Sequence, residues 1–434
     1  MSDLLDFCEV LVNNRCGIIN TLTSEPVPQD IDNLFIFRAE VARPLNYDLS
    51  GPVEGYSDQV VVSGVGTNSD SALRSVLGEG IERYSLMTYR HDLAKSATIE
   101  DLTAPALHPS DLIGYTPSQY QIPNFPYSPF DPQSKIHWAL GHELSSGTNV
   151  YLPASLIWMG IPLLKKDLKF SQSVSSGAAA GASYEQAALG ALLELIERDA
   201  LICRWLIKAA PSKVTDTLVL DQSTSRLVSQ LQQRGAQIDF YDLAVEAFSP
   251  VICTRLQWKD KFPGFVLGTS SSVSRPKAAA KALQEALHVY NNARLTREDE
   301  NGTERIHEYN DIQTFSDHGH YYRKFADLTA TNFFEEDGTC VPTEDLSGSS
   351  FSMALETLVQ RVSDTGKKVI IIDITPPEIA ALGFTVVRCL IPGLQPITAG
   401  AGIECHDTRR LREVSSKLRV PMSKSLNTRP HPLS

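Results

Sequence analysis

Two segments more than a hundred residues apart share the pattern Glu-x-x-Glu-Arg inside stretches that are otherwise apolar with helical spacing. On an α-helix, positions i, i+3 and i+4 lie on one face. Each triplet therefore presents two carboxylates and one guanidinium in the same direction. We expect two long helices, each with a charged spot on an apolar surface. The triplets are Glu79, Glu82 and Arg83 in LGEGIERYSLMTYR, and Glu194, Glu197 and Arg198 in LLELIERDALICRW.

Each triplet has two interpretations. Glu79 with Arg83 and Glu194 with Arg198 are i, i+4 ion pairs of the kind found on exposed helices, worth about 0.3–0.5 kcal/mol each. The flanks favour burial instead, because the second helix is apolar nearly all round. Burying a carboxylate costs free energy unless a positive charge pairs with it. One arginine per two glutamates leaves one negative charge of each triplet unpaired. Mg²⁺ prefers carboxylate oxygens and usually brings substrate phosphates.

A third helix is predicted from Pro276 to Leu295, because proline in the first turn is followed by an alanine-rich run. It adds Lys281 and Glu285 at i, i+4. The three helices together predict a magnesium-nucleotide site. That site is not a P-loop or a G-x-G-x-x-G turn, since neither motif occurs, and G-x-S-x-G and H-E-x-x-H are also absent. We interpret His318 and His320, in a polar segment, as solvated or hydrogen-bonded.

Composition narrows the class of protein. The 434 residues are 42% apolar and 21% charged, as in globular proteins. A net charge of −12 with dispersed lysines and arginines argues against nucleic-acid binding. Seven cysteines without a C-x-x-C pair indicate a reducing cytoplasm and no zinc or disulfide framework. No apolar run approaches the roughly 18 residues that span a membrane, and the acidic N-terminus is unlike a secretion signal.

Strand and helix signals are mixed along the chain, which predicts an α+β (mixed α/β) fold. Residues 101–148 are expected to be an irregular loop and residues 297–350 to be loops with short helices. Strands are expected at 33–43, 59–64, 150–159, 238–243, 251–258, 265–269, 368–373 and 384–391, and the other helices at 67–90, 183–209, 224–234 and 352–365.

The three helical motifs resemble the signatures of the YcaO family of ATP-dependent peptide-backbone-modifying enzymes. CGIINTL near the N-terminus and DITPPEIAALGFTVVRCLIPGLQP near the other end are also similar, so the resemblance covers most of the chain. The matching residues are Ser75, Glu79, Glu82 and Arg83, then Glu194, Glu197, Arg198, Asp199 and Ala200, and finally Lys281, Glu285 and Ala286.

The resemblance implies a YcaO-type fold in which β-sheets pack with long helices around a central Mg-ATP site. Residues 1–60 would be an N-terminal region integral to that fold, and 61–434 the catalytic domain with a proline-bearing tail at 425–434. The implied metal ligands are Glu79, Glu82, Glu194, Glu197 and Glu285. The implied nucleotide-binding residues are Ser75, Glu79, Arg83, Gln186, Arg198, Lys281 and Glu285. The sequence departs from the family pattern at Ala182, Gln186 and Lys281, which bears on the metal count and nucleotide affinity.

In the azoline-forming branch, a Cys, Ser or Thr side chain of a precursor peptide attacks the preceding carbonyl, whose oxygen takes the γ-phosphoryl group of ATP. Members of that branch tend to end in a proline-rich tail that reaches the active site. RPHPLS is similar, which would give Pro432 and Ser434 a catalytic role; a surface tail is the alternative.

The implied partners are the precursor peptide and a leader-binding adaptor that resembles ubiquitin-activating enzymes. A flavin dehydrogenase and a homodimer are further expectations, without nucleic acid or membrane. Two other functions stay open. One is thioamide formation on the same fold, and the other is a non-catalytic ATP-binding scaffold.

Overall fold

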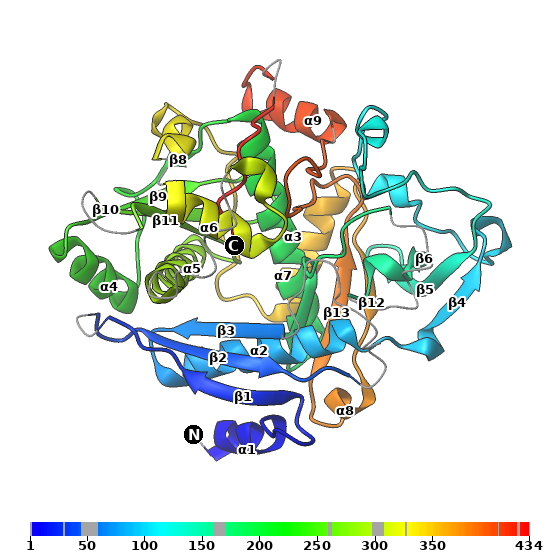
Figure 1. Ribbon diagram of the computed structural model, residues 1–434, viewed down its shortest axis with the longest axis horizontal. Coiled ribbons are helices and arrows are strands. Elements are labelled where there is room, and N and C mark those ends of the chain that lie inside the picture. Colours follow the sequence, from blue (N-terminus) through cyan, green and yellow to red (C-terminus); the bar gives the residue numbers. More distant parts are fainter. Residues whose placement is uncertain are drawn as a thin grey trace.

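The computed structural model describes residues 2–28, 31–44, 60–159, 170–258, 263–296, 308–325, 328–406, 408–422 and 426–433. Their strands form three antiparallel sheets (Figure 1). The first sheet has the order β1 (Ile19–Ser24), β2 (Phe35–Val41), β3 (Val60–Gly66). The second has the order β11 (Phe265–Ser271), β10 (Val251–Trp258), β9 (Ala236–Asp242), β8 (Ser212–Lys213). The third has the order β4 (Ala94–Ala97), β5 (Ile136–Glu143), β12 (Ile370–Asp373), β13 (Thr385–Leu390), β7 (Ala178–Gly181), with β6 (Asn149–Pro153) paired to β5.

The helices pack between and around these sheets. Figure 1 shows α3 running through the middle of the molecule, between the second and third sheets, and α5 lying against the second sheet. Within the described residues, no helix combines the length and apolar character that crossing a membrane requires. The α-helices are α1 (Ser2–Leu11), α2 (Ser69–Met87), α3 (Tyr184–Ile207), α4 (Gln222–Gln233), α5 (Arg275–Thr296), α6 (Phe315–Phe325), α7 (Phe351–Ser363), α8 (Pro377–Ala380) and α9 (Thr408–Leu418).

The three motif helices each follow a strand of a different sheet: α2 follows β3, α3 follows β7, and α5 follows β11. Glycines let two of these helices approach their strands closely. A Cβ atom on Gly64 would lie 2.3 Å from the backbone nitrogen of Val76, and one on Gly268 would lie 2.2 Å from the carbonyl oxygen of Ala282. Side chains at these two positions would push the helices off the sheets. These two glycines therefore determine how close the α2 triplet, and Lys281 and Glu285 of α5, lie to their sheets.

Local capping explains why α2 and α3 begin where they do. The side chain of Asn68 accepts a hydrogen bond from the N–H of Ser71 in a capping box, and the hydroxyl of Ser183 accepts one from the N–H of Gln186. The α3 helix ends at Lys208, which adopts a left-handed φ of 53°. Helices predicted at 67–90 and 183–209 are confirmed within a few residues at each end.

Some predictions were wrong. Residues 101–148 include β5, a central strand of the third sheet, and the strand predicted over 150–159 ends at Pro153. His318 and His320 lie on α6 and not in a loop, and His318 is buried; its Nδ1 bonds to the carbonyl oxygen of His431 at 2.8 Å, which confirms the interpretation of this histidine as hydrogen-bonded. The prolines and tyrosines of residues 101–148 predict a loop, and the alternation of apolar and polar residues that indicates β5 starts only after Lys135. Gln59 and residues 297–307, which belong to two other predicted segments, lie outside the described residues.

Candidate functional site

The α2 triplet forms a tight group. The guanidinium of Arg83 donates to Glu79 Oε1 at 3.1 Å and to Glu82 Oε1 at 2.8 Å. Glu79 Oε2 accepts the backbone N–H of Ser63 on β3 at 3.3 Å. The side chains of Glu79 and Glu82 are 33% and 16% exposed, so neither lies in bulk solvent. The exposed-helix interpretation of this triplet therefore does not hold.

The α3 triplet is held from two sides. Arg198 pairs with Glu194 Oε1 at 3.6 Å and with Glu197 Oε1 at 3.3 Å. The remaining carboxylate positions accept hydrogen bonds from other elements. The donors are the backbone N–H of Gly177 to Glu194 at 3.0 Å, the hydroxyl of Thr269 to Glu197 Oε1 at 2.6 Å, and the backbone N–H of Ser271 to Glu197 Oε2 at 3.1 Å.

Helix α5 brings its glutamate towards the same arginine. Burial works against the charge of Arg198, but Glu197, Glu194 and Glu285 together raise the pKa of that guanidinium. Lys281 and Glu285 are exposed on α5, as is Ser75 on α2. At the start of α3, the side-chain oxygen of Gln186 accepts the N–H of Ala182 at 3.1 Å. Glu285 on α5 thus acts electrostatically on the Arg198 of α3.

Negative charge is in surplus where α2 and α3 meet. Burial, with the nearby Glu194 and Glu79, raises the pKa of Glu82 to about 8 against the opposing effects of Arg83 and Arg388. Burial also raises the pKa of Glu197. Carboxylates from two helices therefore repel one another in a desolvated place, and a hard cation with oxygen ligands fits such a group.

The metal ligands stay a prediction. Among the residues that the structure describes, no three acidic, histidine or cysteine side chains converge closely enough to hold one ion. The carboxylates are turned towards Arg83, Arg198 and the backbone N–H groups of neighbouring elements instead. The donor chemistry fits Mg²⁺, and the side-chain arrangement seen is one in which the arginines supply the positive charge.

The C-terminal tail is packed inside the molecule. Figure 1 shows the C-terminus in its centre, near α3 and α6. Trp205 on α3 donates to the carbonyl of Arg429 at 2.9 Å, and the ring of His431 stacks on His318 with centroids 4.1 Å apart. Burial first, then His318 and Arg198, lower the pKa of His431 well below its ordinary value. Pro432 is buried, so the surface-tail alternative is wrong. Ser434 lies outside the described residues.

Sequence reasoning missed a buried ion pair behind Arg198. Asp199, the next residue, pairs with Arg410 of α9 at 2.5 Å, and Arg410 also pairs with Glu246 at 2.9 Å. Arg410 is fully buried. An aspartate in an apolar helix signals that a cation must meet it, but its partner is 211 residues away and sequence offers no means of locating it. Arg388 of β13, which acts on Glu82, was missed for the same reason.

Three sheets surround a group of arginine-bound carboxylates, and the donor chemistry of that group fits a hard cation with oxygen ligands. The family described as YcaO cyclodehydratase, ATP- and Mg²⁺-binding, matches residues 63–395. This span is most of the chain, and the chain belongs to the YcaO family.

Three relatives show how far this likeness extends. An uncharacterized protein of Methanothermobacter thermautotrophicus is 25% identical over an alignment 345 residues long, which covers 77% of this chain and 82% of that protein. A heterocyclase solved in complex with substrate and cofactor has a TM-score of 0.79 at 21% identity, covering 99% of this chain and 57% of its own. The YcaO protein of Methanopyrus kandleri bound with AMPPCP and Mg²⁺ has a TM-score of 0.62 at 18% identity, covering 91% of each chain.

The chain spans little more than half the length of that heterocyclase. At these identities the solved structures show the fold, and they confirm the predicted YcaO-type, mixed α/β architecture.

Proposed function

We propose that this protein is an ATP-dependent cyclodehydratase subunit that converts Cys, Ser or Thr residues of a ribosomal precursor peptide to thiazolines or oxazolines. The observation that carries the proposal is the pair of desolvated carboxylate–arginine triplets on α2 and α3, with Glu285 acting on the same Arg198. Membership in a family described as cyclodehydratases that bind ATP and Mg²⁺ supports it.

The reaction balances as a dehydration driven by phosphoryl transfer. The side-chain sulfur or oxygen loses its proton and bonds to the preceding carbonyl carbon. The carbonyl oxygen then takes the γ-phosphoryl group as the bond from phosphorus to ADP breaks. Phosphate leaves with that oxygen, the amide nitrogen gives up its proton, and a C=N double bond forms. Catalysis of this kind is positioning and charge neutralisation.

We assign the basic residues to the phosphate groups of ATP and the acidic residues to Mg²⁺. Arg83, Arg198 and Lys281 meet phosphate oxygens, and Ser75, Glu79, Gln186 and Glu285 complete the nucleotide contacts. Mg²⁺, when bound, would neutralise phosphate charge, and Glu79, Glu82, Glu194, Glu197 and Glu285 are the residues that would hold it. Opening the ion pairs of Arg83 and Arg198 would free both the guanidinium groups and the carboxylates for these roles.

The tail packs against α3 and α6, and the charge of Arg198 acts on the ring of His431. Two prolines restrict the backbone on either side of His431, and hydrogen bonds from Trp205 and Tyr322 hold the carbonyls of Arg429 and Pro430. A rigid segment beside Arg198 suits the positioning of a peptide carbonyl, which is the catalytic role we assign to Pro432 and Ser434. A leader-binding adaptor would bring the precursor peptide to this place.

The test combines purified protein with the adaptor, the precursor peptide, ATP and Mg²⁺. Mass spectrometry should show loss of one water for each modified residue, with release of ADP in equal amount. Replacement of oxygen by sulfur, seen as a gain of mass, would assign the site to thioamide formation. Absence of both changes and of ATP turnover would leave only a scaffold role and refute the proposal.

A further inference from the structure

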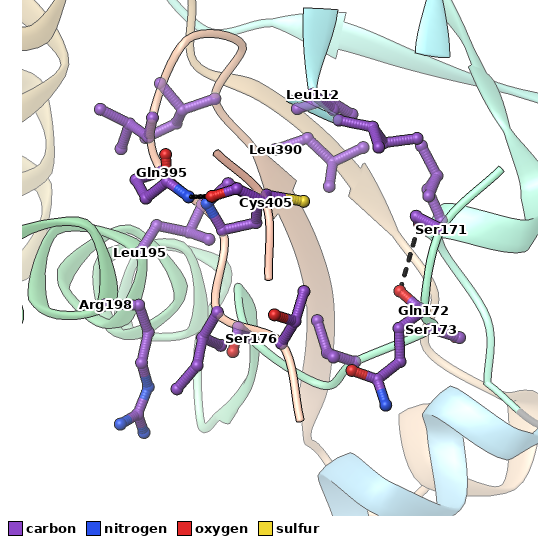
Figure 2. Close-up of a pocket in the computed structure, with 18 of the residues that line it drawn as sticks. Leu112, Ser171, Gln172, Ser173, Ser176, Leu195, Arg198, Leu390, Gln395 and Cys405 are labelled. Atoms are coloured by element: carbon purple, nitrogen blue, oxygen red, sulfur yellow. Dashed lines mark hydrogen bonds between the residues drawn. The ribbon is translucent and has the colours of Figure 1, made fainter. Parts of the chain in front are cut away.

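A cavity of about 100 Å³ lies against the stem of Arg198. Much of its lining comes from α3, β13, the segment 171–176 and the loop 391–398. Figure 2 shows Leu195 and Arg198 on the α3 side of this space and Leu112 and Ser171 on the opposite side. None of the predicted metal-binding glutamates lines it. The cavity is therefore separate from the carboxylate cluster, although it shares Arg198 with it.

Most polar side chains in the wall are already bonded to the protein. The amide of Gln172 makes two hydrogen bonds with the backbone of Ala399, at 3.1 and 2.8 Å, and the amide nitrogen of Gln395 donates to the carbonyl of Cys405. Arg388 donates to three backbone carbonyls. The remaining surface is largely aliphatic. It comprises Leu112, Ile113, Leu156, Leu195, Leu390 and Ile391.

The position of the cavity relates it to the charged cluster and to the tail. The guanidinium of Arg198 points away from Leu195 and Gln395 in Figure 2, and it pairs with Glu194 and Glu197. Thr398 lines the cavity on another side, and its carbonyl accepts a hydrogen bond from the His431 ring at 2.9 Å. The apolar space thus lies between the groups that would meet phosphate and the buried tail.

We propose that this cavity receives the aliphatic side chain of the residue that precedes the modified Cys, Ser or Thr in the substrate peptide. The inference rests on the proposed function, because the attacked carbonyl belongs to that preceding residue. Its side chain begins two bonds from the carbonyl carbon. When the carbonyl oxygen meets the phosphoryl group beside Arg198, the side chain therefore reaches the adjacent apolar space.

The size of the cavity limits which side chain it accepts. A cavity of about 150 Å³ holds a benzene ring. A space of about 100 Å³ suits the four-carbon side chains of leucine and isoleucine or the smaller valine, and it excludes an indole. A nucleotide base fits the wall poorly, because both ends of the Gln172 amide and the amide nitrogen of Gln395 are engaged with the backbone. Among the described polar atoms of the wall, the amide oxygen of Gln395 is buried without a hydrogen-bond partner, and one acceptor alone does not read the edge of a base.

The test uses fluorescein-labelled peptides Gly-Gly-X-Cys-Gly-Gly, with X as glycine, leucine or tryptophan. Binding is measured by fluorescence anisotropy with saturating ADP and Mg²⁺, and water loss is measured with ATP. We expect the leucine peptide to bind about ten-fold more tightly than the glycine peptide, and the tryptophan peptide no better than glycine. Leu112→Phe, which fills the cavity, should abolish the leucine preference and leave the KM for ATP unchanged.

Leu140→Phe is the matched control, because Leu140 is exposed on β5 and does not line the cavity. It should keep the leucine preference. Ser171→Leu fills the cavity from the opposite wall if Leu112→Phe does not fold.

Equal binding of the leucine and glycine peptides to the wild type would overturn the inference, as would an unchanged preference in both filled variants. A raised KM for ATP without a change in peptide preference would assign the cavity to the nucleotide instead. Leucine preference without water loss in any peptide would support the cavity assignment while refuting the proposed function.

Discussion

The two helices that carry Glu-x-x-Glu-Arg are alike in sequence and differ in how the protein holds them. The α2 triplet is bonded to one sheet, through Ser63 of β3. The α3 triplet is bonded to Gly177 next to β7 and to β11, which belong to two other sheets. The side chain of Glu197 is 11% exposed, whereas that of Glu79 is 33% exposed. The α3 half of the site is therefore anchored to two sheets, and the α2 half is anchored to one.

The residue after each arginine shows the same difference. On α2 it is Tyr84, whose hydroxyl donates to Glu378 at 2.8 Å near the surface. On α3 it is Asp199, which pairs with the fully buried Arg410. The same motif is thus followed by a residue with a contact near the surface on α2 and by a residue with a contact in the core on α3. The motif therefore specifies the charges of the site, while the residue that follows its arginine decides how firmly the helix is held.

Arg410→Met should have the largest effect on stability. It leaves Asp199 and Glu246 buried without their cation, and breaking a buried pair in this way costs about 3–5 kcal/mol. Urea denaturation measures the loss. Arg412→Met, at an exposed position on the same helix, should change the free energy of unfolding by less than about 0.5 kcal/mol. Similar losses in both variants would show that Arg410 has no special role.

Glu197→Gln should lower ATP turnover by about 10²–10³-fold, the usual cost of losing one preorganised electrostatic group. Its hydrogen bonds from Thr269 and Ser271 can be kept in part by the amide oxygen, so the fold should persist in circular dichroism. Glu356→Gln, on the exposed face of α7, is the control and should retain full turnover. Unchanged turnover in Glu197→Gln would contradict a role for the α3 triplet.

Glu82 should make stability depend on pH. Its pKa of about 8 in the folded protein exceeds its ordinary 4.5, so the folded state holds the proton more tightly than the unfolded state between these values. The contribution of Glu82 is therefore complete below pH 4.5 and is lost as pH rises through about 8. Without magnesium, the free energy of unfolding should fall over this window. The fall should be smaller in Glu82→Gln, by at least about 1 kcal/mol.

The measurement for Glu82 is urea denaturation at several pH values for the wild type and Glu82→Gln. Titrating groups that do not interact with Glu82 contribute equally to both proteins, so the difference between them isolates Glu82 together with its neighbours Glu79 and Glu194. A difference that stays constant from pH 5 to pH 8 would contradict the raised pKa.

Tyr84→Phe should have the smallest effect. It removes one hydrogen bond to Glu378 in a partly exposed place, which corresponds to about 0.5 kcal/mol at the low end of such contributions. ATP turnover should be unchanged. A loss comparable to that of Arg410→Met would mean that α2 is held as firmly as α3, and the distinction between the two halves would fail.

The sequence predicted the long helices well, because their capping residues and apolar spacing are local signals. Asn68 and Ser183 cap α2 and α3 as their side chains allow, and Pro276 lies in the first turn of α5. Helix α9 was not predicted, since seven of its eleven residues are charged or serine. Its position depends on Arg410, whose partners lie on distant parts of the chain.

The part of the site that depends on the spacing of residues along one helix was predictable from the sequence. Glu79, Glu82 and Arg83 converge because a helix places i, i+3 and i+4 together. The backbone N–H groups of Ser63 and Ser271 carry no signal in their own residue types, so their hydrogen bonds to the glutamates required the fold. The aliphatic cavity also required the fold, because its lining residues come from six separate stretches of the chain.

The hydrogen bonds from Ser63, Gly177 and Ser271 have a consequence for how the molecule unfolds. They connect the carboxylates to elements of all three sheets. A ligand that binds these carboxylates stabilises the folded state by RT ln(1 + [L]/Kd), and it does so for the three sheets at once. Loss of any one sheet would release the ligand. Occupancy of the proposed nucleotide site would thus make unfolding more cooperative, and the lifetime of the protein against proteolysis would become a function of nucleotide concentration.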